Sequence, residues 1–171
     1  MKREQIRPPS LPRKILLFLQ SRYLAFLLRV ILGGLFVAAS WDKILHPARF
    51  VEDVANYGIL PPLLVNLCAL ILPWLEMIAG LFLVLGFFPK SSALILSLLL
   101  ASFTVAISIN IARGAEIDCG CFGAGEELSW ATLLRDLLLL AMAIQIFVYD
   151  QGFLAVDALW NRDNEEKKRD I

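Results

Sequence analysis

The sequence has few charged residues, three cysteines and one histidine, and each shortage excludes a class of protein. Charged residues make up 19% of the 171 residues and hydrophobic residues 58%, so a soluble fold of this size would expose large apolar patches. Sixteen basic residues balance sixteen acidic ones, which leaves no cationic field to attract nucleic acid. Three cysteines and one histidine exclude both a disulfide-dense scaffold and a Cys/His zinc module.

Long stretches with little or no charge predict four membrane spans. Residues 91–112 carry no charge and would rise about 33 Å as a helix, enough to cross a hydrocarbon core of roughly 30 Å. The stretches 23–41, 61–88 and 129–149 contain one or two charged residues each. Because all four exceed strand length and lack alternation, we predict an all-α, integral membrane four-helix bundle. This domain covers 23–150, between a basic N-terminal segment (1–22) and a charged tail (151–171).

The basic residues are unevenly divided between the two ends of the expected bundle. Eleven of the sixteen lie before the first span, between the second and third spans, and in the tail, whereas three lie in the other two connections. This bias predicts both termini in the cytoplasm of a bacterial inner membrane, with 42–60 and 113–128 in the periplasm. We expect a short interfacial helix within 42–60. Cleavage of the first span after Ser40 is an alternative, because Ala38-Ala39-Ser40 resembles a signal-peptide site.

The connection between the third and fourth spans carries the clearest candidate for chemistry. Cys119 and Cys121 flank Gly120, and this spacing permits a disulfide if the chain bends. Such a small ring would be strained, and strained exposed disulfides tend to be oxidising and labile. On the periplasmic side the pair favours thiol–disulfide redox activity, with structural thiols or a metal site as alternatives. Cys68, which has apolar neighbours in the second span, is expected to be a packing residue.

Polar residues within the expected spans are the second group of candidates. A charge at membrane depth costs about 2.5–3.5 kcal/mol, so such residues are usually paired or mark a site. Asn110, Arg135 and Asp136 predict a polar pocket beneath the cysteines, suited to a quinone head group or a proton. Glu76 lies near mid-membrane, and His46, at the outer end of the first span, is a candidate proton relay. The alternative is a Glu76–Arg135 or Arg135–Asp136 pair that only fixes helix register.

Other residues have structural interpretations. Ser129 is the expected N-cap of the fourth helix, with Leu128 and Leu133 as a hydrophobic staple. Pro89 is expected in the connection before the third span. We interpret four aromatic residues as interface or packing side chains: Trp41, Tyr57, Trp74 and Trp130.

Several segments together resemble the DoxX-like/MauE group of small four-span membrane proteins. They are 42–47, 57–61, 72–76 with Gly80 and Gly86, 118–123, and 130–136. The resemblance covers about residues 23–150 and implies a redox-associated integral membrane protein. Its MauE branch is linked to maturation of methylamine dehydrogenase, whose small subunit needs periplasmic disulfides. Its DoxX branch is linked to quinone-coupled sulfur oxidation.

We therefore expect a thiol–disulfide redox or maturation factor that exchanges disulfides through Cys119 and Cys121. The supporting polar site would contain Glu76, Asn110, Arg135, Asp136 and His46. Electrons would pass to a quinone or to a periplasmic, thioredoxin-like partner, and we expect no metal and no nucleic acid. A non-catalytic membrane anchor of a redox complex is one alternative. A small-solute transporter that uses the intramembrane charges is the other.

Overall fold

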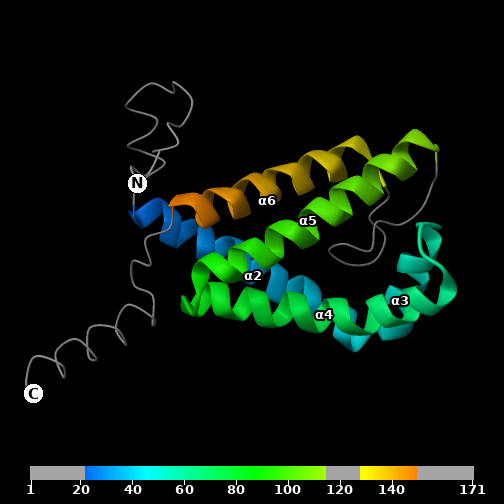
Figure 1. Cartoon of the computed structure of the whole chain (residues 1–171), viewed down its shortest axis with the longest axis horizontal. Helices are drawn as coiled ribbons and strands as arrows, with labels where there is room; N and C mark the ends of the chain where they lie inside the picture. Colours follow the sequence, from blue (N-terminus) through cyan, green and yellow to red (C-terminus); the bar gives the residue numbers. More distant parts are fainter. Residues whose placement is uncertain (1–21, 115–127, 150–171) are drawn as a thin grey trace, which may run out of the picture.

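The computed structural model of this chain describes residues 22–114 and 128–149 (Figure 1). These residues form α2 (Arg22–Leu45), α3 (Pro47–Asn56), α4 (Pro62–Leu85), α5 (Pro89–Ala112) and α6 (Trp130–Tyr149). The helices α2, α4, α5 and α6 are each long and apolar enough to cross a membrane. Within the described ranges there is no strand. The predicted all-α membrane bundle is confirmed, and the chain is a multi-pass membrane protein.

The helix ends follow local sequence signals. Pro47, Pro62 and Pro89 each begin a helix, a position where the missing N–H of proline has no partner to lose. The sequence had predicted Pro89 in the connection, but it is the first residue of α5. Gly86 ends α4 with a left-handed φ of 75°, so only three residues are needed for the turn into α5. The predicted cap of α6 is confirmed, because the Ser129 hydroxyl accepts a backbone N–H three residues on, at 3.3 Å.

Two close helix pairs form the bundle, α2 with α4 and α5 with α6 (Figure 1). Aliphatic and aromatic side chains from all four spans meet in a single core, which includes Leu32, Phe36, Leu83, Leu96, Leu100, Leu139 and Ile146. The outward faces of the same helices are also apolar. On α4, for example, Leu63, Leu67, Leu70 and Ile71 are exposed. A surface of this kind suits lipid and not water, which agrees with the span assignment.

The short helix α3 lies at the end of the bundle where α2 stops and α4 begins (Figure 1). It is amphipathic: Phe50 is buried against the spans, while Arg49 and Glu52 are exposed. The expected short helix in this connection is therefore present. α2 also runs one turn past the predicted end at residue 41, as far as Leu45. Lys43 therefore belongs to this helix and not to the connection that follows it.

A glycine pair allows α2 and α4 to pack closely. A Cβ added at Gly33 would lie 2.7 Å from the Gly80 carbonyl oxygen and 2.6 Å from Val84 Cγ2, which is closer than real contacts. A Cβ added at Gly80 would lie 3.0 Å from the Gly33 carbonyl oxygen. Small residues at such crossings are typical of membrane helices, because backbone contact replaces the hydrophobic effect as the source of attraction. This crossing brings the next two turns of α2 against α4.

Replacement of Gly33 by alanine should therefore destabilise the bundle. Because the new methyl group meets backbone on α4, we expect Gly33→Ala to lower the free energy of unfolding by about 1–3 kcal/mol. Its matched control is Gly34→Ala, whose new Cβ has nothing within 4 Å and which should be neutral or slightly stabilising. Thermal unfolding in detergent micelles, followed by circular dichroism, measures both. Equal midpoints for the two variants would contradict the close crossing.

Candidate functional site

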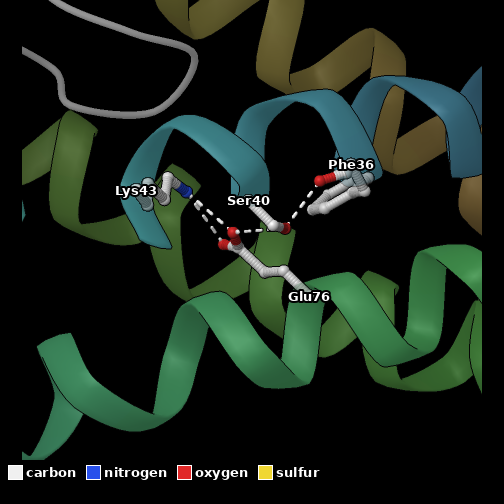
Figure 2. Close-up of polar contacts among 4 residues, drawn as sticks. All are labelled: Phe36, Ser40, Lys43 and Glu76. Atoms are coloured by element: carbon white, nitrogen blue, oxygen red, sulfur yellow. Dashed lines mark hydrogen bonds and ion pairs between the residues drawn. The ribbon is translucent and has the colours of Figure 1, made fainter. Parts of the chain in front are cut away.

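A buried ion pair joins α2 to α4 inside the bundle (Figure 2). Lys43 Nζ lies 2.8 Å from Oε2 and 3.1 Å from Oε1 of Glu76, and the side chains are 6% and 1% exposed. The Ser40 hydroxyl, nearly one turn before Lys43, lies 3.4 Å from Glu76 Oε2 and 2.6 Å from the Phe36 carbonyl oxygen. Because water does not reach either charge, each depends on the other for its stability in this position.

Aromatic rings enclose the ammonium end of this pair. Lys43 Nζ lies 5.0 Å from the centroid of the Phe50 ring and 5.5 Å from that of the Phe103 ring. These distances are within the range of cation–π attraction, which strengthens when water is excluded. Lys43 therefore contacts α3 and α5 as well as Glu76 on α4. The sequence had placed Glu76 among the candidate site residues but did not identify Lys43 as its partner.

A second buried polar pair joins α5 to α6. The Thr104 hydroxyl donates a hydrogen bond to the carboxylate of Asp136, which is buried. Asp136 also lines a small void of about 10 Å³ together with Lys43, Glu76 and Phe103. The ion pair and Asp136 therefore line the same void, and all four spans contribute to it. We call Ser40, Lys43, Glu76, Thr104 and Asp136 the buried polar cluster.

Asn110 ties the segment after α3 to α5. Its side-chain amide donates to the Tyr57 carbonyl oxygen at 3.2 Å and to the Ala106 carbonyl oxygen at 3.0 Å. Tyr57 is buried and forms a small cluster with Ile107, against which Ile111, Leu128 and Leu133 pack. The last turn of α5 and the start of α6 therefore meet at this cluster. The residues predicted as the staple of α6 pack against it, a role that the sequence interpretation of Tyr57 as a packing aromatic did not specify.

The environment of Tyr57 favours its neutral form. Burial raises the pKa of the Tyr57 phenol above its ordinary value, and the negative charges of Asp136 and Asp53 raise it further. Asp53 lies on α3 and Asp136 on α6, so negative charges on two helices act on the phenol. The hydroxyl group therefore stays protonated over the physiological pH range.

The structure does not bring all predicted site residues together. His46 lies at the exposed junction of α2 and α3, where its Nδ1 is 3.2 Å from Asp42 Oδ1. Arg135 is half-buried on α6, next to Asp136 in the chain. Cys119 and Cys121 lie outside the described residues. In the part of the chain that is described, no three His, Cys, Asp or Glu side chains are grouped closely enough to hold a metal ion.

Four apolar spans around a buried polar cluster place this chain among the polytopic helical membrane proteins. Comparison with known proteins identifies its family. The family described as "Methylamine utilisation protein MauE" matches residues 21–149, and the chain belongs to it. The resemblance to DoxX-like proteins stays a prediction.

Curated relatives carry the same description. The methylamine utilization protein MauE of Paracoccus denitrificans is 38% identical over 132 residues, which cover 75% of this chain and 71% of that protein. The MauE of Paracoccus versutus is 34% identical over 129 residues, covering 74% and 69%. That of Methylorubrum extorquens is 37% identical over 111 residues, covering 63% and 60%. No solved structure matches this chain.

Neutralising one member of the ion pair should destabilise the protein strongly. Glu76→Gln leaves the Lys43 ammonium buried without its counter-charge, and we expect a loss of about 3–5 kcal/mol in the free energy of unfolding. The double variant Lys43→Met/Glu76→Gln removes both charges and should recover most of that loss. Glu52→Gln, on the exposed face of α3, is the matched control. Unfolding midpoints in detergent measure all three, and a Glu76→Gln midpoint equal to that of the control would exclude a buried ion pair.

Tyr57 should make stability depend on pH in the alkaline range. Because its pKa is raised in the fold, the unfolded chain releases the phenolic proton first, and stability should fall as pH rises above about 10. Below that pH both states keep the proton and this residue contributes no slope. Tyr57→Phe removes the titrating group, so its unfolding midpoint should fall less steeply above pH 10. Parallel curves for the two proteins would show that the phenol ionises equally in both states.

Proposed function

We propose that this chain is an accessory membrane protein of methylamine utilisation that exchanges disulfides with a periplasmic partner through Cys119 and Cys121. The family and the descriptions of the curated relatives support the first part. The Cys-Gly-Cys spacing supports the second part. The partner is a protein with a cysteine pair, of the thioredoxin-like kind or a dehydrogenase subunit during maturation. The membrane is the bacterial inner membrane, with both termini in the cytoplasm, as the distribution of basic residues favours.

The observation that carries this proposal is the way the cysteine connection is anchored. The connection leaves α5 after Ala112 and re-enters the described structure at Leu128. Ile111, Leu128 and Leu133 all pack against Tyr57 and Ile107, so both ends of the connection are held at one place. Asn110 adds a hydrogen bond at the same point. The two ends of the connection that carries Cys119 and Cys121 therefore lie together at one end of the bundle, which supports a partner site at that end.

The exchange conserves atoms and electrons. A partner thiolate attacks one sulfur of the oxidised Cys119–Cys121 pair, which breaks that disulfide and forms a mixed disulfide. The second thiolate of the partner then displaces the first, and the partner leaves oxidised while the pair in this chain is reduced. The two electrons and protons received must pass to an acceptor, for which we propose a membrane quinone. The reverse direction would reduce a partner disulfide by the same steps.

The other predicted site residues have supporting roles in this proposal. Asn110 and Asp136 act at the end of the bundle that carries the cysteine connection, through their contacts with Tyr57 and Thr104. Glu76 holds α4 against α2 through Lys43. For His46 and Arg135 a role near the thiols stays a prediction.

Growth and thiol trapping test the proposal. In a Paracoccus denitrificans strain that lacks its own MauE, this chain should restore growth on methylamine, and Cys119→Ser/Cys121→Ser should not. The matched control is Cys68→Ser, which removes the thiol of the second span and should restore growth normally. Cys121→Ser alone should accumulate a mixed disulfide, visible on non-reducing gels and identified by mass spectrometry.

Three results would contradict this function. Normal growth with both cysteines replaced would leave a non-catalytic anchor of a redox complex as the better description. A reporter fused after Gly125 that proves cytoplasmic would place the pair on the reducing side of the membrane. Loss of growth with Lys43→Met/Glu76→Gln, in a protein that is stable and keeps exchanging disulfides, would favour a transporter that uses the buried charges.

A further inference from the structure

A large apolar cavity lies between α4 and α5, beneath α3. The two spans meet at their short connection and separate toward α3 (Figure 1), and the cavity occupies the gap with a volume of about 360 Å³. Its walls include Phe50, Tyr57, Cys68, Leu72 and Phe103. This volume is within the range of about 300–1,000 Å³ that is usual for small-molecule sites. It is far larger than a packing defect, since filled cores leave few voids larger than a water molecule.

The cavity opens at the surface where α5 meets the connection between α3 and α4. Ile59 and Leu60 in that connection and Ser102 on α5 line it, and all three are exposed. Leu98 and Val105, which are exposed on α5 on either side of Ser102, are apolar, so a molecule dissolved in the bilayer reaches this opening along α5. The site therefore selects lipid-soluble molecules over solutes of the aqueous phase.

We propose that this cavity binds the ring of a membrane quinone. Three aromatic side chains, Phe50, Tyr57 and Phe103, contribute to its walls, and a planar ring gains offset-stacking contacts with such walls that a flexible acyl chain does not. The carbonyl oxygens of a benzoquinone accept hydrogen bonds at the ring edge, which suits a largely apolar cavity whose lining includes the phenol of Tyr57, a hydrogen-bond donor. The carboxylate of Asp53 also repels the phosphate of a lipid head group.

The cavity shares one lining residue with the place where the cysteine connection is attached and one with the void beside the buried polar cluster. Tyr57 lines the cavity and also packs against Ile107, Leu128 and Leu133, where the cysteine connection begins and ends. Phe103 lines the cavity and also the small void that faces Lys43, Glu76 and Asp136. Tyr57 is therefore shared between the cavity and the attachment of the cysteine connection, and Phe103 between the cavity and the void. The sequence had instead predicted a quinone pocket made by Asn110, Arg135 and Asp136, none of which lines this cavity.

The electron transfer in this assignment rests on the proposed function, whereas the binding does not. Reduced Cys119 and Cys121 would lose their two S–H bonds and form a disulfide, and the quinone would take up both electrons and both protons to become a quinol. Binding is a property of the cavity alone. It is therefore tested in a protein that cannot exchange disulfides, so that failure of one proposal is distinguishable from failure of the other.

Cys68 reports directly on the cavity. The chain has three cysteines, so Cys119→Ser/Cys121→Ser leaves Cys68 as its only thiol, at the cavity wall. In detergent micelles we expect decylubiquinone to slow the reaction of Cys68 with N-ethylmaleimide, by about tenfold when the quinone is at ten times its Kd. Decylubiquinone is fully substituted on its ring, so it has no free position for the thiol to add to. A rate unchanged by saturating quinone would overturn the proposal.

Two matched comparisons establish that protection comes from this site. Ala106→Phe, added to the single-thiol protein, fills part of the cavity and should abolish protection, whereas Val105→Phe places the same ring on the lipid-facing surface and should preserve it. Equal protection in both would overturn the assignment. Decylbenzene, which has the same tail and no carbonyl oxygens, should protect at least tenfold less well. Equal protection by decylbenzene would show an unselective apolar groove and would also overturn it.

A smaller substitution guards against misfolding of the cavity-filling variant. Tyr57→Phe removes the phenol hydroxyl of a residue at the cavity wall and keeps its ring. We expect it to weaken quinone protection of Cys68 severalfold, and its unfolding midpoint at neutral pH shows that the variant is folded. An unchanged Kd in this variant, combined with full protection in a folded Ala106→Phe protein, would place the quinone elsewhere.

Discussion

The ion pair between Lys43 and Glu76 is the constraint on which the arrangement of the spans depends. Burying the charge of an unpaired lysine or glutamate in an apolar interior costs several kcal/mol. The helices are therefore most stable in an arrangement that brings the two side chains together. Their meeting fixes the rotation of α2 and its register along α4. Gly33 and Gly80 make this possible, because they let the two backbones approach closely at a point between two and three turns before Lys43 on α2. Phe50 and Phe103 then close over the ammonium group, which brings α3 and α5 to the same place.

In the second helix pair, α5 and α6, a buried carboxylate is held by a neutral hydrogen-bond donor and not by a lysine. Thr104 donates a hydrogen bond to the carboxylate of Asp136, and Asp136 lines the same small void as Lys43 and Glu76, so each helix pair is joined by a polar contact inside an otherwise apolar bundle. Tyr57 and Asn110 connect this interior to the end of the bundle where the cysteine connection is attached. This attachment and the neighbouring apolar cavity are the two features from which we propose a chemical role for the chain.

Charge depletion alone determined the fold class of this protein. Twenty-residue stretches that must satisfy their backbone hydrogen bonds without water form helices, so the number of spans, their approximate limits and the short helix between the first two could be predicted from the sequence. The cap at Ser129 is also a local signal and was predicted, as was the energetic cost that marks Glu76 and Asp136 as important. The Cys119–Cys121 pair is a candidate from spacing and residue type alone, and its redox role stays a prediction.

Only the tertiary structure decided which residues meet. The sequence placed Lys43 in a connection, because nothing local shows that α2 continues one turn past residue 41. That turn depends on the burial of Lys43 against Glu76, thirty-three residues away, and no periodicity records such a partner. For the same reason the sequence predicted Tyr57 only as an interface or packing aromatic. No sequence pattern indicated the cavity beside it. A cavity arises where two helices diverge, and helix crossing angles are set by packing between elements and not by the residues of either one.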